Sequence, residues 1–333
     1  MDNSSLEAYL DGSTYNRETV RFYDVAHEGA QIRAVVGAIP SLRGLHQLQP
    51  RSVVVVAMDQ VSDASARFVG RMRSPLRTPL VITDSLPSYV GALDIVIVLG
   101  DRADDPDTSR GLISADRRGA TTILVGPPRG PILEDAPDDT IVVPALPTVF
   151  GASPARSIAA LSAVLDLLEE DSDLVAQRLS DTADCVDEEL EQLSPERDSL
   201  VNPGRQLREY VYLARVVHTG RGRPGFAVAE LMSVVWSLKG MASGVAAVDE
   251  LELPPPAPEH NIFHDPLLDG PVDLLALKVV VWAEDPDVAA ALPSALAVNC
   301  DTPGTGPLAA ALKLITRGLA ATAYDLPEAP SED

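Results

Sequence analysis

The chain has 333 residues, of which 46% are hydrophobic and 4% aromatic, and its formal net charge is -23. Its length suffices for two domains, and its acidity argues against nucleic acid and anionic membranes as partners, since both bind basic patches. The two cysteines, Cys185 and Cys300, exclude a disulfide framework and suit a reducing compartment. The sequence contains no stretch of about 18 apolar residues and no signal peptide, so we expect a soluble, cytoplasmic protein.

Residues 1–39 are predicted to form a helical N-terminal segment, in which a long amphipathic helix over 16–36 acts as a lid or a wrapping helix. Short apolar runs rich in β-branched residues follow, and most are separated by helical patterns. Such runs predict strands buried on both faces of a parallel sheet. The predicted strands of this first unit cover residues 52–57, 79–83, 94–99, 121–125 and 140–143, and helices are predicted at 61–72 and 107–118.

The second half repeats the same order of strands and helices on a smaller scale. Helices over 153–169 and 173–193 form a hairpin that joins the halves, and a polar break at 197–204 marks the boundary. The predicted fold class is therefore α/β, with two tandem doubly wound, flavodoxin-like parallel-sheet units at 40–200 and 201–333. The elements predicted after the boundary are strands at 215–219, 244–248 (weakly signalled), 274–282 and 295–299, and helices at 226–241, 287–292 and 308–324.

The third strand ends in Gly100, and the loop behind it carries three carboxylates and one arginine, Arg102. Ligands of open α/β sheets bind beyond the carboxyl ends of the strands, which makes this loop a candidate site. The alternative is a solvated acidic loop that caps the next helix through Asp104, Asp105 or Asp107. The spacing of the carboxylates matches no metal motif, and we assign no cofactor.

A second candidate is the basic loop Arg221-Gly222-Arg223-Pro224-Gly225, between a strand and a helix. Its arginines and the N-terminus of the following helix are suited to an anion such as a phosphate. The alternative is an ordinary surface turn. His218, near the end of the preceding strand, either faces a cleft or is a buried strand histidine.

Short segments of both halves carry a family resemblance. In the second half they are Asn202 to Leu207 (N-P-G-R-Q-L), Arg215 to Gly220 (R-V-V-H-T-G) and Glu259 to Asn261 (E-H-N). In the first half, T-P-L-V-I-T-D and then D-I-V-I-V-L-G follow a strand and a helix. Over roughly residues 40–325, the chain resembles the SIS (sugar isomerase) domains of bifunctional phosphoglucose/phosphomannose isomerases, and it looks most like a divergent actinobacterial branch.

The resemblance implies isomerisation of glucose 6-phosphate and mannose 6-phosphate, a small-molecule phosphosugar ligand and a homodimer. His260 stands at the place of the family's catalytic histidine and would serve ring opening; the alternative is a loop histidine held by backbone contacts. In the family the phosphate is held by the loops after the first and third strands. Those loops would here offer the Ser62 hydroxyl, Gly100 and Arg102.

Two departures from the family pattern lead to a competing hypothesis. The acidic loop replaces the family's hydroxyl-rich one, and a carboxylate about 5 Å from a phosphate costs roughly 3 kcal/mol per charge pair at an effective dielectric of about 20. No carboxylate stands at the place of the catalytic glutamate after the helix 226–241. Losing that base would slow proton transfer by about 10²-fold to 10⁴-fold. The alternatives are a non-catalytic SIS protein that binds a phosphosugar or nucleotide sugar or regulates a partner, and a purely structural scaffold.

Overall fold

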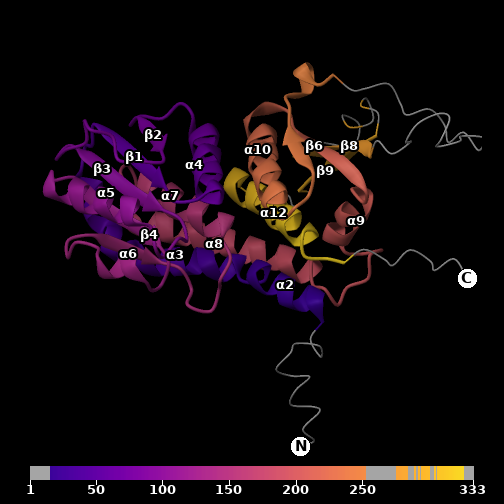
Figure 1. Ribbon diagram of the computed structural model, residues 1–333, viewed down its shortest axis with the longest axis horizontal. Coiled ribbons are helices and arrows are strands. Elements are labelled where there is room, and N and C mark those ends of the chain that lie inside the picture. Colours follow the sequence, from indigo (N-terminus) through magenta and orange to yellow (C-terminus); the bar gives the residue numbers. More distant parts are fainter. Residues whose placement is uncertain are drawn as a thin grey trace, which may run out of the picture.

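The computed structural model describes residues 16–252, 275–283, 289, 292, 294–300, 304 and 306–325. Two parallel sheets are covered by helices (Figure 1). The first sheet has the strand order β2-β1-β3-β4-β5, and the second has the order β7-β6-β8-β9. The strands are β1 (Ser52–Ala57), β2 (Leu80–Thr83), β3 (Asp94–Leu99), β4 (Thr121–Gly126), β5 (Ile141–Pro144), β6 (Ala214–Thr219), β7 (Ser243–Val245), β8 (Ala276–Trp282) and β9 (Ala295–Val298).

This arrangement confirms the predicted α/β fold with two parallel-sheet units. In the first unit the helices agree with the predicted ranges within two residues, except for a short one at 131–134 that was not predicted, and the helix predicted at 226–241 begins four residues earlier. The following sections use eight helices. They are α4 (Gln60–Arg73), α5 (Pro106–Arg117), α6 (Pro131–Glu134), α7 (Pro154–Leu167), α8 (Ser172–Gln192), α9 (Pro203–Tyr210), α10 (Gly222–Leu238) and α12 (Pro307–Ala321), with short 3-10 turns at Arg43–Gln47 and Val248–Glu250.

Alternate residues of each strand in the first sheet enter different cores, because successive side chains of a strand point to opposite faces. Val53 and Val55 of β1 join a large core with α4 and α7, whereas Val54 and Val56 join a smaller one with α5 and α6. The large core continues into the second unit, where Trp236 and Trp282 are fully buried. The two units therefore share one continuous apolar interior.

The N-terminal helical segment is broken where a single helix is predicted. The chain forms α2 (Arg17–Val25) and α3 (Glu28–Leu42), which are separated at Ala26 and His27. Helix α3 packs against α7 and α8 and buries Ile32 and Val35 completely. It is therefore part of the core and no lid, whereas α2 contacts α12 of the second unit.

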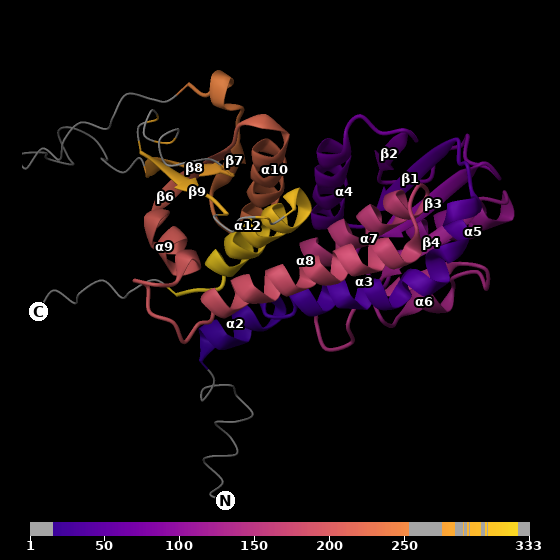
Figure 2. The ribbon, with the colours of Figure 1, turned by 180° about the vertical axis from the view of Figure 1, so that it is seen from behind.

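Helix α8 runs beneath both units (Figure 2). Helix α3 lies antiparallel along it, with Arg43 paired to Asp173 and Arg33 paired to Asp187, while α7 and α12 also pack against it. Above it, α4 and α10 pack directly against each other. Arg71 of α4 donates two hydrogen bonds of 2.8 Å to Glu230 and stacks on Phe226, its guanidinium carbon 4.9 Å from the ring centroid. These contacts fix the second unit beside the first sheet.

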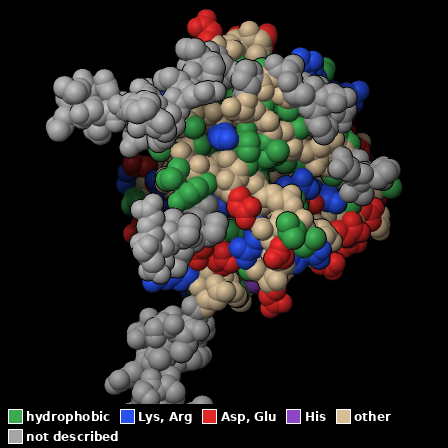
Figure 3. Space-filling model, turned by 90° about the vertical axis from the view of Figure 1, so that its right-hand side faces the viewer, with side chains coloured by type: hydrophobic (Ala, Val, Ile, Leu, Met, Phe, Trp, Pro, Cys, Tyr) green, Lys and Arg blue, Asp and Glu red, His purple; other side chains and the backbone are tan. Residues whose placement is uncertain are grey.

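Helix α9 was not predicted, although its start has a clear signal. The Asn202 side chain accepts hydrogen bonds from the Gly204 and Arg205 N–H groups, at 3.0 and 3.1 Å, and Pro203 stands at the first helical position. The polar composition of 197–204 led to the prediction of a break instead. Figure 3 shows the end of the molecule at which the second sheet lies, and acidic and basic side chains are intermixed over its lower part.

Candidate functional site

Three polar segments converge at the carboxyl end of the first sheet. Asp59 follows β1 and caps α4: its Oδ1 accepts from the Ser62 N–H at 2.8 Å, and the Ser62 hydroxyl accepts from the Asp59 N–H at 3.1 Å. This reciprocal pair is a capping box, which satisfies donors that a helix N-terminus leaves free. The Ser62 hydroxyl also donates to the Asp59 carbonyl at 2.8 Å, so its proton is used within the chain.

The loop after β3 closes over the same carboxylate. The Asp101 N–H donates to Asp59 Oδ2 at 3.0 Å. Gly100 has φ +142°, and a Cβ there would lie 2.5 Å from that oxygen, so only glycine fits. Main-chain N–H groups at a helix N-terminus and a strand end normally form an anion site. Here the Asp59 carboxylate occupies that place.

A buried charge cluster continues behind Asp59. The Asp101 carboxylate pairs with the fully buried Arg156 of α7, which also donates to the Gly126 carbonyl at 3.0 Å. Burial raises the pKa of Asp101, as does the neighbouring Asp59, and Arg156 opposes the rise. The positive charge of Arg156 is therefore balanced by the Asp101 carboxylate of the same chain.

Glu28, the first residue of α3, lies next to this cluster. Its Oε2 accepts from the Ala155 N–H at the start of α7 at 2.9 Å, and the side chain is almost completely buried. Burial raises the pKa of Glu28 to about 7, and hydrogen bonds from Ser153 and Ala155 only partly offset that effect. Near neutral pH this carboxyl group can both give and take a proton.

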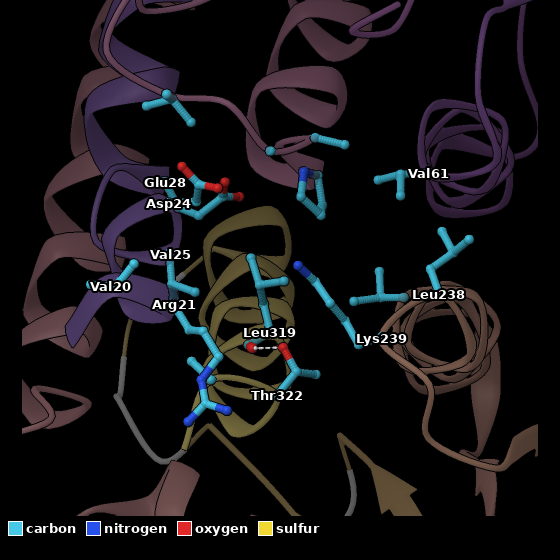
Figure 4. Close-up of a pocket in the computed structure, with 16 residues that line it drawn as sticks. Val20, Arg21, Asp24, Val25, Glu28, Val61, Leu238, Lys239, Leu319 and Thr322 are labelled. Atoms are coloured by element: carbon cyan, nitrogen blue, oxygen red, sulfur yellow. Dashed lines mark hydrogen bonds between the residues drawn. The ribbon is translucent and has the colours of Figure 1, made fainter. Parts of the chain in front are cut away.

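A cavity of about 460 Å³ opens between the two units beside this cluster (Figure 4). Its wall comes from α2, the start of α3, the N-termini of α4 and α7, the end of α10 and the end of α12, and is mostly apolar. The lining residues are Val20, Arg21, Asp24, Val25, Glu28, Val61, Val149, Gly151, Ala152, Pro154, Val235, Leu238, Lys239, Leu319, Thr322 and Ala323.

The charged groups of the cavity lie on different sides. Figure 4 shows Asp24 and Glu28 together on the α2–α3 side, whereas Lys239 reaches in from the end of α10. Asp24 accepts from the Phe150 N–H at 3.3 Å, and Arg21 is paired with Asp325. Within the described residues, Lys239 has no hydrogen-bond or ion-pair partner for its side chain.

A second cavity, of about 810 Å³, lies between α4, α7, α8 and the start of α12. Its arginines are already paired: Arg73 and Arg178 contact Asp166 at 2.7 and 3.0 Å. Among the described residues, no loop that follows a strand of the first sheet lines it, and the lining residues Gly304 and Gly306 lie between β9 and α12. The first cavity is therefore the better candidate for a ligand site.

The residues predicted around the acidic loop have separate environments. Ser62 and Gly100 are buried, whereas Arg102 is exposed and its side chain makes no hydrogen bond or ion pair with the described residues. Asp105 caps α5, with its Oδ1 accepting from the Thr108 N–H at 3.1 Å. The capping role given as the alternative for this loop is thus confirmed for Asp105.

In the basic loop after β6, the backbone at Gly220 and Gly225 passes close to other main-chain segments. A Cβ at Gly220 or Gly225 would overlap neighbouring main-chain atoms, including the Trp282 carbonyl. Arg223 donates to the Ser74 carbonyl at the end of α4, and Arg221 is exposed with no partner in the described structure. Arg223 therefore links the two units, and of the two arginines in this loop only Arg221 has no partner among the described residues.

His218 is a buried strand histidine, which confirms that alternative. Its Nδ1 accepts from the Trp282 indole N–H at 3.0 Å, and its ring meets Trp236 edge-on at 4.6 Å. Burial lowers its pKa to about 3. The imidazole is therefore neutral and shielded, and it faces neither of the two cavities described above.

His260, the predicted catalytic residue, lies outside the described residues, as do Asn261, His264 and Asp265. The sequence interpretation also missed Glu28 and Lys239. Glu28 stands in the N-terminal segment, which carries no strand-end signal, and only the packing of α3 on α7 brings it to the sheet. Lys239 directly follows the end of α10, close to the place at which the family pattern led us to look for a carboxylate.

The described residues contain no group of three or more His, Cys, Asp or Glu that could hold a metal ion. The helices in the described part of the chain include none that is long and apolar enough to cross a membrane.

No protein-family model and no curated protein sequence matches the chain. Solved structures do match. The C-terminal domain of glucosamine-fructose-6-phosphate aminotransferase from Francisella tularensis aligns with 93% of this chain and 97% of its own at 11% identity and a TM-score of 0.58. The fold is that of SIS domains. Tagatose-6-phosphate ketose/aldose isomerase from Escherichia coli aligns with 91% of this chain and 92% of its own at 12% identity and a TM-score of 0.59. At these identities the SIS likeness describes the architecture alone.

Proposed function

We propose that this SIS-fold chain binds a small phosphorylated sugar in the cavity between its two units. The observation that carries the proposal is the position of that cavity, beside the carboxyl ends of β1 and β5, with two carboxylates on one side and a lysine on another. Ligands of open parallel sheets bind at this edge. The structural neighbours that are named for phosphosugar chemistry add support.

The role that we favour is binding or regulation without turnover. Asp59 fills the anion site at the N-terminus of α4, and Arg156 is neutralised by Asp101. Efficient isomerisation needs a tightly held phosphate and a carboxylate base at the reacting carbon atoms. The candidates glucose 6-phosphate and mannose 6-phosphate come from the family resemblance. In this proposal the protein binds them without converting them.

A second candidate function is aldose–ketose isomerisation with Glu28 as the base. Its pKa of about 7 suits a group that must accept and return a proton near neutral pH. Glu28 also lines the cavity that would hold the substrate. This reading predicts measurable interconversion of glucose 6-phosphate and fructose 6-phosphate, which Glu28→Gln lowers by about 10²-fold to 10⁴-fold.

Isothermal titration calorimetry with glucose 6-phosphate, mannose 6-phosphate, fructose 6-phosphate and glucose tests the proposal. We expect at least one hexose phosphate to bind and Ala152→Trp, which fills the cavity, to abolish the heat signal. Ala136→Trp is the matched control, because Ala136 is also half-buried but does not line the cavity. Absence of binding to the wild-type chain, or equal binding by both variants, would refute the proposal.

We also propose a homodimer, on the family resemblance alone. Equilibrium sedimentation at micromolar concentration is expected to give twice the monomer mass of 35.3 kDa. A monomer throughout the concentration range would contradict this part of the proposal and leave the cavity site standing.

A further inference from the structure

We infer that Lys239 binds the anionic group of the ligand, so that the phosphate lies at the α10 side of the cavity and away from the N-terminus of α4. The inference rests on the proposed function, because it concerns the same cavity. It assigns the phosphate to a side chain of the second unit, and it assigns the sugar hydroxyl groups to the carboxylates of the first.

The first step is that the anion site of the first sheet is closed. Asp59 uses both carboxylate oxygens there, one toward the Ser62 N–H and one toward the Asp101 N–H. Gly100 leaves no room beyond that carboxylate. A phosphate placed there would have to displace Asp59 and would still meet Asp101, so like-charge repulsion excludes it.

The second step is that the other nearby cations are already paired. Arg156 contacts Asp101 and the Gly126 carbonyl, and it is fully buried. Arg21, which lines the cavity, is paired with Asp325. Two described cations line the cavity, Arg21 and Lys239. Of these, only Lys239 has no hydrogen-bond or ion-pair partner among the described residues.

The third step is the direction of Lys239 within the cavity. In Figure 4 its ammonium group points into the open space near Leu319, and Asp24 and Glu28 stand on the other side. A ligand with one anionic end and several hydroxyl groups matches this polarity, since carboxylates accept from hydroxyl groups and repel phosphate. A sugar phosphate in the opposite orientation would place its phosphate beside Asp24.

Calorimetric titration of Lys239→Met with a hexose phosphate and with the matched free hexose tests this assignment. We expect the dissociation constant of the hexose phosphate to rise by about tenfold, as for loss of a charge-assisted hydrogen bond. The weak binding of free glucose is expected to stay unchanged. Lys239→Arg keeps the charge and is expected to retain most of the affinity. Raising the salt concentration is expected to weaken phosphate binding by the wild type more than by Lys239→Met.

The control variant is Arg102→Met, which removes an exposed cation from the acidic loop at the strand end. If the phosphate lies at Lys239, this control binds as the wild type does. Equal affinity of Lys239→Met and wild type, or a loss confined to Arg102→Met, would overturn the inference. Failure of the wild-type chain to bind any hexose phosphate would instead overturn the proposed function. Lys239 is exposed and follows the end of α10, and a melting curve for each variant verifies that the fold is intact.

Discussion

The carboxyl ends of the two parallel sheets differ in what fills them. At the first sheet, Asp59, Asp101 and Arg156 form a charged cluster beside a cavity. At the second sheet, His218 and Trp282 are fully buried, and the crossing of Gly220 and Gly225 closes the backbone over them.

The comparison shows that a parallel strand end becomes a site only where packing leaves room. Both sheets offer the same topology, but two buried tryptophans give the second end the character of a core. The charged first end stays open toward α10 and α12. Each of the following experiments either removes this difference or measures it.

The largest expected effect comes from opening the closed end. Trp282→Ala removes a fully buried indole and the hydrogen bond to His218, and we expect the free energy of unfolding to fall by about 3–5 kcal/mol. Urea denaturation followed by circular dichroism measures the loss. If the variant loses less than about 1 kcal/mol, the second end is not the packed core that we describe.

Glu28→Gln tests the charged end through pH. The pKa of Glu28 is raised from 4.5 to about 7, so the folded state holds more protons than the unfolded state between these values. Wild-type stability is therefore lost as pH rises through this window, by at most about 3 kcal/mol. The neutral variant lacks this loss.

Unfolding curves of both proteins at pH 5 and pH 8 measure the difference. We expect Glu28→Gln to gain stability relative to the wild type at pH 8, and to show little gain at pH 5. A relative stability that is the same at both pH values would contradict the buried, protonated carboxyl group.

Asp59 variants have a smaller effect on stability and a qualitative effect on the anion site. Asp59→Ala removes the cap of α4 and is expected to cost about 1 kcal/mol, whereas Asp59→Asn keeps a capping side chain and costs less. With the carboxylate gone, Asp59→Ala is expected to bind inorganic phosphate more tightly than the wild type. Calorimetry with phosphate that shows no gain would mean that the carboxylate does not block an anion site.

The smallest effects are expected at Arg102 and Arg221, which are exposed and have no partners in the described structure. Substitution of either by alanine is expected to change the free energy of unfolding by less than about 0.5 kcal/mol. Thermal melts of the two variants check this. Their ligand affinities separately test the sequence-based prediction that these arginines hold a phosphate. If the phosphate lies at Lys239, both variants are expected to bind as the wild type does.

The sequence was most informative where local composition decides the structure. The bounds of β1 and β3 agree with the prediction to the residue, because uninterrupted β-branched runs favour a strand buried on both faces. The weaker signal at β7 still marked a strand, although a shorter one. The helices α4, α5, α7 and α8 were likewise predicted within two residues of their ends.

The site was less predictable, because it depends on contacts between distant segments. The acidic loop was recognised, but its interaction with Arg156 joins residues 55 apart in the sequence. Glu28 and Ala155 are separated by 127 residues. The helical periodicity of 16–36 continues across the break at His27. An amphipathic pattern therefore does not indicate that the helix axis changes direction there. No local signal placed Glu28 beside a strand end.

The length of helix α8 sets the spacing between the two units. Its 21 residues correspond to about 32 Å of rigid rod, since each residue adds about 1.5 Å. One inserted residue would also rotate everything after it by about 100°, carrying α12 away from α2 and pulling the cavity walls apart. We therefore expect a single-residue insertion in α8 to disrupt the cavity even where it lies on the solvent face of the helix. Substitutions on that face are expected to have little effect.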